Sequence, residues 1–266
     1  MKTKTAGVFF FFTLVIVSLT IPYHNDSFSK SHTMEPVNTP PPACRKSIKF
    51  EVEGVPVWEI SDSGALLFVS GMSINADGAP NTYHPEDKGI DFLANAGRPG
   101  NWRSLVTHNG RRDGVPIIQG PSDPFPGFYI STTALFDPTK PITKPGRYVD
   151  SRLVPYFVLP MGCSGGGRLG DLGVVINLRK DLQSSAIYAD IGPCNKIGEG
   201  SIRLADNLGI DSDPKWGGVS DGIAYLVFPD SGNDKPKPSE DIETQAMEQF
   251  EHWGGIERLR CCLQWP

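Results

Sequence analysis

The chain has 266 residues, of which 39% are hydrophobic and 21% are charged, and its formal net charge is −5. This acidic balance argues against nucleic acid as a partner, because phosphate binding needs clustered Lys and Arg. The length suits one sizeable β-rich domain, and the 29 Gly and 24 Pro indicate many short strands and turns. The sequence therefore predicts a mainly β protein with a few helices, of the α+β class.

The N-terminal segment has the pattern of an export signal. Lys2 and Lys4 precede an apolar run that begins at Ala6 and continues to Ile21. A charged region followed by an apolar region is typical of a secretory signal peptide. The run is long and has no Ala-x-Ala site, so an uncleaved signal anchor is the alternative. We expect residues 1–22 to direct export, a secreted or extracellular location, and membrane contact only through this segment.

Three further regions follow the signal. Residues 23–44 are polar, end in a run of prolines, and are expected to form a disordered linker. Residues 45–233 are expected to form a single catalytic β-domain. Residues 234–266 are expected to form a second linker and a C-terminal amphipathic helix.

Five cysteines occur in a chain that is expected to be exported, where disulfides persist. The odd count leaves at least one thiol unpaired or paired between chains. A Cys163–Cys194 bridge would join two loops, and Cys44 could instead tie the linker to the C-terminal tail. Both pairings stay open, because connectivity cannot be deduced from sequence.

The β-domain has the pattern of short strands separated by turns. Residues 47–52 alternate between polar and apolar side chains, as a half-buried strand does. Residues 154–160 are nearly all apolar, and the prolines that flank them favour an edge or an end of the sheet. Further strands are expected at residues 55–60, 65–70, 115–119, 127–132, 172–177, 185–189 and 222–228.

Three helices are expected. Pro85 can open a short helix that stops near Gly97. Ser201 can cap a helix over residues 202–208. The best helix begins at Ser239 and ends at Gly254–Gly255, with one apolar stripe; the residues of that stripe are Ile242, Ala246, Phe250 and Trp253.

The stretch from Ile187 to Ser201 carries the strongest chemical signal. It begins as an apolar strand, breaks at Gly192-Pro193, and continues through Gly198-Glu199-Gly200-Ser201 toward a helix. Asp190 and Glu199 stand at the two sides of this Gly-rich loop, and paired carboxyls can supply the proton donor and the proton acceptor that a bond hydrolysis needs. The alternative is that the two acids have a purely structural role, because Asp favours turns and negative charge favours helix N-termini.

A second polar cluster lies between residues 77 and 91. Its functional interpretation is a substrate-binding rim beside the acid pair, and its alternative is an ordinary turn with locally satisfied side chains. The cluster comprises Asp77, Asn81, Tyr83, His84 and Asp91. No pair of histidines has metal-ligand spacing and no phosphate-binding loop occurs, so we expect neither a metal nor a cofactor.

Several strings in the chain are similar to those of glycoside hydrolase family 75, the secreted endo-chitosanases of fungi with relatives in bacteria. The resemblance covers about residues 46–233, and the tail from Ser239 onward has no counterpart in it. The matching strings are Asp77-Gly78-Ala79-Pro80-Asn81-Thr82-Tyr83-His84-Pro85, Tyr129-Ile130-Ser131-Thr132-Thr133, Arg147-Tyr148-Val149-Asp150, Gly170-Asp171-Leu172, Ala189-Asp190-Ile191-Gly192-Pro193, Ile197-Gly198-Glu199-Gly200-Ser201 and Asp221-Gly222-Ile223-Ala224-Tyr225.

The resemblance implies a barrel-like fold, of six strands and of the double-psi type, and cleavage of β-1,4 glucosamine linkages in chitosan with inversion. It makes Asp190 and Glu199 the catalytic pair. Asp190 closes an apolar strand, where burial would raise its pKa and suit a general acid. Glu199 lies near Lys196 and a helix N-terminus, which suits a general base. The opposite assignment of the two roles is the alternative.

The predicted substrate-binding residues are those that would pair with ammonium groups, stack on sugars or line the cleft. They are Asp77, Tyr83, His84, Asp91, Gln119, Asp171, Tyr188 and Lys196, with Trp102 and Trp216 as further stacking or core aromatics. The expected partner is a polysaccharide, and the chain is expected to be a monomer. The rival functions are hydrolysis of chitin or of the peptidoglycan glycan, and non-catalytic polysaccharide binding at the wall.

Overall fold

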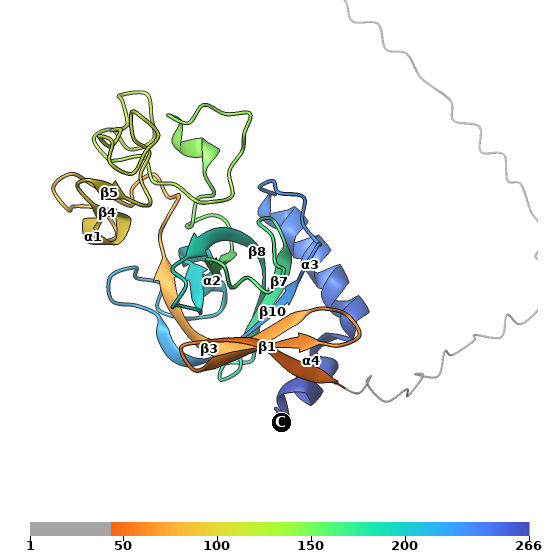
Figure 1. The fold of residues 1–266 in the computed structure, drawn as a ribbon. Helices are drawn as coiled ribbons and strands as arrows, with labels where there is room; N and C mark the ends of the chain where they lie inside the picture. The colour runs from red at the N-terminus through yellow and green to blue at the C-terminus, as the bar shows by residue number, and fades with distance from the viewer. Residues whose placement is uncertain (1–43, 266) are drawn as a thin grey trace, which may run out of the picture. The chain divides into compact units, whose positions relative to one another are not determined.

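The computed structural model describes residues 44–265, which form a mainly β fold with four α-helices (Figure 1). The expected signal at residues 1–22, and the expected linker up to residue 43, lie outside the described residues. Within the described range, no helix has the length and apolar character needed to cross a membrane.

Six strands close into a barrel. Their order is β3-β10-β7-β8-β6-β9, and β9 pairs back with β3. The pairs β3–β9 and β6–β8 are parallel, and the others are antiparallel. The strands are β3 (Leu66–Asn75), β6 (Tyr156–Pro160), β7 (Leu172–Asn177), β8 (Leu182–Gly192), β9 (Glu199–Ser201) and β10 (Val219–Phe228). The prediction of a mainly β, barrel-like α+β domain is confirmed.

A hairpin extends the sheet beyond the barrel. Strands β1 (Lys46–Val52) and β2 (Val55–Ile60) pair antiparallel, and β2 continues onto β3. Glu53 and Gly54 form the two-residue turn with φ of 48° and 82°. Two successive positive φ values match the twist of a tight hairpin, so Gly54 relieves the strain at one of these positions.

Alternation along the strands sorts the core into two layers. On β10, Ala224 and Leu226 pack in the layer that includes α3 (Ser239–Trp253). Their neighbours Ile223, Tyr225 and Val227 pack in the other layer, which faces the barrel interior. Tyr225 stacks on Phe68 there, with ring centroids 4.6 Å apart. Each fully buried large side chain of this kind contributes about 1.5–3 kcal/mol.

Two predicted helices form where the sequence places them. The Ser201 side chain accepts a hydrogen bond from the Leu204 N–H at 3.1 Å and caps α2 (Ile202–Asn207). The helix α3 buries the expected stripe and ends at Gly254, which has a φ of 120°. The stripe comprises Ile242, Ala246, Phe250 and Trp253.

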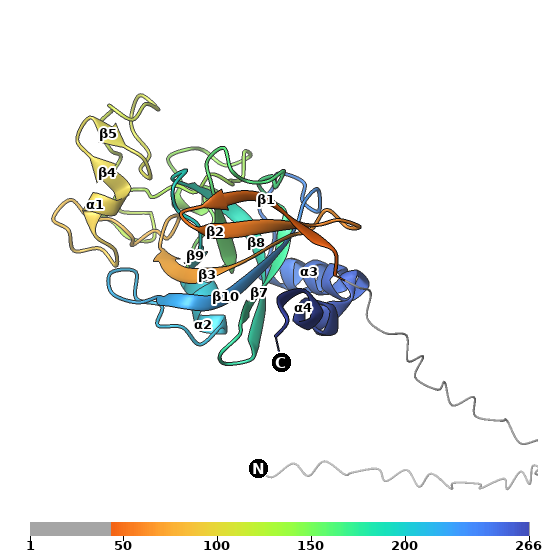
Figure 2. The ribbon, with the colours of Figure 1, turned by 60° about the horizontal axis from the view of Figure 1, so that its bottom comes forward.

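The chain continues after Gly254 into a helix that the sequence reasoning missed, α4 (Gly255–Leu263). The helices α3 and α4 lie side by side along one side of the barrel (Figure 1 and Figure 2). A disulfide joins Cys44 to Cys262 of α4, which is the second of the two open pairings. Cys163 and Cys194 do not bond to each other. The buried Arg258 binds Asp62 at 2.5 Å and thereby holds α4 against the loop after β2.

Residues 76–155 are less regular than predicted. The expected strands at 115–119 and 127–132 make only isolated bridges, such as Ile118 with Tyr129. The expected helix from Pro85 to Gly97 reduces to α1 (Leu93–Ala96), followed by the short strands β4 (Gly97–Arg98) and β5 (Asn101–Trp102). A 3-10 turn covers Pro145–Arg147. Hydrogen bonds between loops satisfy the backbone N–H and C=O groups of this region, so these groups do not need the pairing of a continuous sheet.

The prediction that the flanking prolines put β6 at an edge or an end of the sheet is wrong. The strand β6 lies inside the barrel between β8 and β9, not at an edge. Pro155 precedes the strand and its carbonyl accepts the Ile187 N–H at 3.1 Å, while Pro160 is the last residue. Neither proline removes a donor from the middle of the ladder, which is the only place where proline excludes a central strand.

Candidate active site

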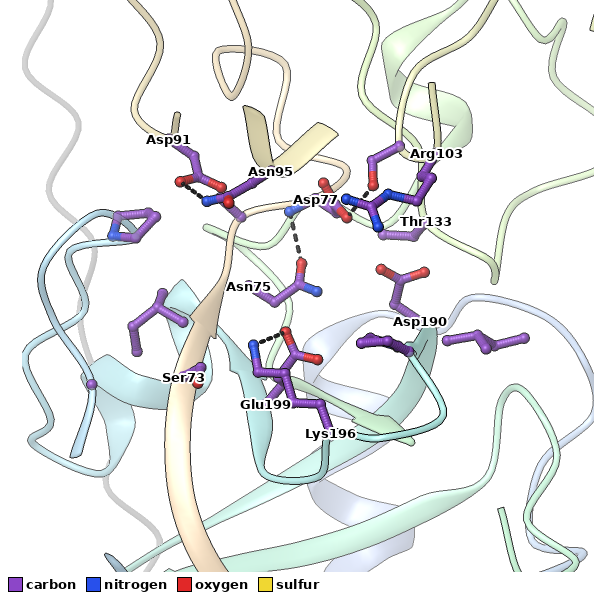
Figure 3. A pocket seen from close by; sticks show the side chains of 18 of the residues that line it. Ser73, Asn75, Asp77, Asp91, Asn95, Arg103, Thr133, Asp190, Lys196 and Glu199 are labelled. Atoms are coloured by element: carbon purple, nitrogen blue, oxygen red, sulfur yellow. Dashed lines mark hydrogen bonds and ion pairs between the residues drawn. The ribbon is translucent and has the colours of Figure 1, made fainter. Parts of the chain in front are cut away.

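A cavity of about 1080 Å³ opens between the barrel and the loops of residues 76–134 (Figure 3). The strands β3, β8 and β9 each contribute their ends to its lining, and the loop of residues 214–218 closes another side. Its volume suits a ligand the size of several sugar rings, since small-molecule sites span about 300–1,000 Å³.

Asp190 and Glu199 face this cavity from two strands on either side of β6. Val158 of β6 pairs in register with Asp190 of β8 and with Glu199 of β9. Two strand spacings of about 4.8 Å each separate their backbones by about 9–10 Å. Figure 3 shows both carboxyls turned into the same cavity. The register therefore sets two acids across a gap in which a water and a sugar can sit.

Asp190 is half-buried at the end of β8. Its Oδ1 accepts the Ala134 N–H at 2.9 Å. Burial raises the pKa of Asp190 to about 7, and the negative charge of Glu199 adds to this, while backbone N–H groups and Asn75 act in the opposite direction. At mildly acidic pH this carboxyl therefore holds a proton.

Glu199 has a different environment. Its Oε1 lies 2.9 Å from Lys196 Nζ, in an ion pair three residues apart, and the residue is only 9% exposed. Its Oε2 occupies the space beside Gly192, where a Cβ would approach that oxygen to 2.9 Å. The absence of a side chain at position 192 thus leaves room for the carboxylate to face the cavity.

Gly198 fixes the approach of this loop to β3. Its φ is +86°, and an added Cβ would lie 2.4 Å from Ser70 Oγ and 2.5 Å from the Gly71 carbonyl oxygen. The Gly198 carbonyl accepts the Ser73 N–H at 2.9 Å. Only glycine combines the left-handed backbone with this close contact, so Gly198 sets the position of the adjacent Glu199.

A second group of acids lies on the loop side of the cavity. Asp77 is 8% exposed; its Oδ1 accepts the Tyr83 hydroxyl and its Oδ2 accepts the Ser104 hydroxyl, each at 2.7 Å. Burial, followed by the charge of Asp190, raises the pKa of Asp77 well above its usual range. Asp91 accepts the Asn95 amide at 2.8 Å, and burial raises its pKa too.

The structure brings six predicted residues together in the cavity lining. These are Asp77, Tyr83, Asp91, Asp190, Lys196 and Glu199. Trp216 lies at the rim, because it is 79% exposed and its neighbours Lys215 and Gly217 line the cavity. Its ring packs edge-to-face on Phe92 at 5.2 Å.

Gln119 and His84 do not line the cavity. Gln119 is 2% exposed, and its Nε2 donates to the carbonyls of Pro80 and Tyr129. His84 Nδ1 accepts the Glu86 N–H at 3.0 Å. Both side chains hold loops together, because they satisfy backbone groups that no regular strand pairs.

Asp171 and Tyr188 also lie away from the cavity. Asp171 is 1% exposed and accepts the N–H groups of Arg168 and Gly232 at 2.7 and 2.9 Å. Tyr188 is 3% exposed and stacks on Phe157 inside the barrel. Asp171 thus fixes a turn, and Tyr188 fills the core two residues before Asp190 on β8.

Several polar lining residues escaped sequence reasoning. They are Ser73, Asn75, Asn95, Arg103, Ser104, Arg112 and Thr133. Only Asn75 had a local signal, because it lies two residues before the predicted binding residue Asp77. Ser73 lies on β3, Asn95 lies on α1 and the others lie in loops, and the proximity of all of them to Asp190 depends on chain crossings that no local pattern encodes.

Two general comparisons complete the description of the site. Among residues 44–265, no group of three or more His, Cys, Asp or Glu side chains has an arrangement that would hold a metal ion. No protein-family model matches the chain, and a search of curated proteins finds no significant match either.

Proposed function

We propose that this chain is an endo-acting glycoside hydrolase that cleaves β-1,4 glucosamine linkages of chitosan by an inverting, two-carboxylate mechanism. The observation that carries the proposal is the placement of Asp190 and Glu199 on either side of β6, facing one open cavity. Inverting enzymes hold their carboxyls about 6.5–9.5 Å apart so that a water fits. A backbone separation of two strands is compatible with that requirement.

The different environments of Asp190 and Glu199 support one assignment of the roles. Asp190, with its pKa raised to about 7 by burial, donates its proton to the leaving glycosidic oxygen. Glu199, ion-paired with Lys196, takes a proton from the water that attacks the anomeric carbon from the opposite face. One proton enters the leaving group and one leaves the water, so the pair exchanges its protonation states in each turnover.

Chitosan is favoured as substrate by the loop acids and by the resemblance to the endo-chitosanase family. Asp77 and Asp91 face the cavity, and neither forms an ion pair with any residue between 44 and 265. A glucosamine ammonium group in the cavity would supply the missing cation. Trp216 at the rim offers an exposed aromatic face for a sugar ring.

A second candidate, hydrolysis of the peptidoglycan glycan, is favoured by two arginines. Arg103 and Arg112 are exposed, line the same cavity, and have no carboxylate partner within the part of the chain that the structure describes. They also line an adjoining hollow of about 260 Å³ beside Trp102 and Tyr148. Paired guanidinium groups suit the carboxylates that such a glycan carries on alternate sugars.

The test is reducing-sugar release by the purified chain from chitosan, chitin and soluble peptidoglycan glycan strands, with the anomer of the first product read by NMR. We expect release from chitosan with an inverted first product. Glu199→Gln and Asp190→Asn should abolish release, while Glu59→Gln, an identical change on the distant strand β2, should leave it intact.

The outcomes separate the candidates. Release confined to peptidoglycan strands, and lost in Arg103→Ala, would favour the second candidate. Binding of polysaccharide without release would favour a non-catalytic wall-binding role. Full release by both carboxyl variants would overturn the catalytic pair.

A further inference from the structure

Asn75 lies in the cavity beside both catalytic carboxyls, and the mechanism above does not use it (Figure 3). It is the last residue of β3 and pairs in register with Ser201 of β9. Ser73, two residues earlier on β3, pairs with Glu199. Because residues two apart on a strand share one face, Asn75 and Glu199 face the same side of the sheet.

The amide of Asn75 has only one satisfactory orientation. Its Oδ1 accepts the Asp77 backbone N–H at 2.8 Å, and the Tyr156 hydroxyl lies 2.8 Å from the same oxygen. A backbone N–H can only donate, so a flipped amide would place an NH2 group against a donor. The fully buried Tyr156 closes that side, and the Nδ2 group is therefore directed away from it.

The direction in which Nδ2 points is toward Asp190, as Figure 3 shows. Asn75 lowers the pKa of Asp190 and so works against burial, which raises it. The Ala134 N–H holds the Asp190 carboxyl from another direction, at 2.9 Å from Oδ1. Asp190 thus accepts a backbone donor and has the Asn75 amide beside it in the cavity.

We propose that Asn75 is a positioning residue of the hydrolysis, whose side-chain amide donates to Asp190 and orients that carboxyl toward the leaving oxygen. This inference rests on the proposed function. A purely structural role would be different: Asn75 would only hold the turn at Asp77, through its acceptor oxygen.

Two variants separate these roles. Asn75→Asp keeps an acceptor for the Asp77 N–H and Tyr156 but loses the donor toward Asp190, and Asn75→Ala loses both functions. We expect kcat on chitosan to fall about 10- to 100-fold in both variants, with KM changed less than about twofold. Asn207→Asp, the same change at an exposed position of α2 outside the cavity lining, is the matched control and should keep kcat.

The pH profile gives a second readout. Loss of the donor raises the pKa of Asp190, so the alkaline limb of kcat should move up by about one pH unit in both variants. A structural role would lower the melting temperature and leave this limb in place. Wild-type kcat and pH limb in Asn75→Asp would overturn the proposal.

Failure of the proposed function would be recognised separately. If wild type releases no sugar, carbon NMR titration of the Asp190 carboxyl still tests the contact in the folded chain. An Asp190 pKa that is the same in wild type and Asn75→Ala would then overturn the role of Asn75. A higher value in Asn75→Ala would keep the contact and reject only the reaction.

Discussion

The cavity holds two pairs of acids that differ in what positions them. Asp190 and Glu199 belong to strands, and their separation follows from the register of β8 and β9 on β6. Asp77 and Asp91 belong to a loop, and hydroxyl and amide side chains hold them in place. Groups carried on regular elements are held more accurately than groups carried on loops. The strand pair is therefore suited to bond cleavage, and the loop pair to recognition.

The largest effect is expected from Glu199→Gln, which removes one carboxylate of the strand pair. Loss of the base should lower kcat about 10²- to 10⁴-fold, because that is the usual contribution of general acid–base catalysis. The measurement is kcat on chitosan at the optimum pH, with Glu59→Gln as the control. A loss below about tenfold would mean that Glu199 is not the base.

The next largest effect is expected from the backbone that supports the strand pair. Gly198→Ala should lower stability by about 1–3 kcal/mol more than Gly166→Ala, because overpacking costs that much. Both glycines have a positive φ, but only Gly198 has atoms within 4 Å of an added Cβ. Thermal unfolding of the two variants measures the difference, which should be about 2–4 °C per kcal/mol.

Activity should follow stability in Gly198→Ala, because the displaced loop carries Glu199. Gly166→Ala should keep wild-type kcat. Equal melting temperatures and equal kcat in the two variants would show that the strand pair tolerates movement of this loop.

A smaller effect is expected on the pH dependence of stability. Burial raises the pKa of Asp190 to about 7 in the fold, above the unfolded value of about 3.9. Its contribution to stability is therefore complete below about pH 4 and is lost as pH rises through about 7. The melting temperature of Asp190→Asn should therefore depend less on pH than that of wild type. At pH 8 it should be higher than the wild-type value.

The control for this measurement is Asp206→Asn, an exposed aspartate on α2. Its melting temperature should run parallel to that of wild type from pH 4 to pH 8. A parallel curve for Asp190→Asn would mean that burial does not perturb the pKa of Asp190.

The smallest effect belongs to the loop pair. Asp91→Asn should raise KM for chitosan about threefold to tenfold and change kcat less than about twofold, because one solvated ion pair contributes about 1 kcal/mol. Chitin oligomers, which lack ammonium groups, serve as the matched substrate and should show no change in KM. A large fall in kcat would mean that Asp91 acts in bond cleavage like the strand pair, and it would contradict the separation of cleavage from recognition.

Local signals were enough for several features of this protein. The apolar run of β10, the Ser201 cap and the apolar stripe of α3 are encoded by neighbouring residues. The strand that leads to Asp190 and the turn before Glu199 could also be predicted, because glycine and proline mark the end of the strand and the turn. Local patterns thus indicated the acid pair and the mainly β class, and the resemblance to the endo-chitosanase family implied the barrel.

Only the tertiary structure decided which side chains meet. Gln119, Asp171 and Tyr188 have residue types that suit a binding site, but they fill the core or satisfy buried backbone groups. Asn75 was overlooked, although it lines the same cavity as Asp190 and Glu199. The reason is physical: barrel closure pairs β9 with β3 across more than a hundred residues of chain. Periodicity along one strand determines which face a residue takes, and the pairing between strands determines what lies opposite.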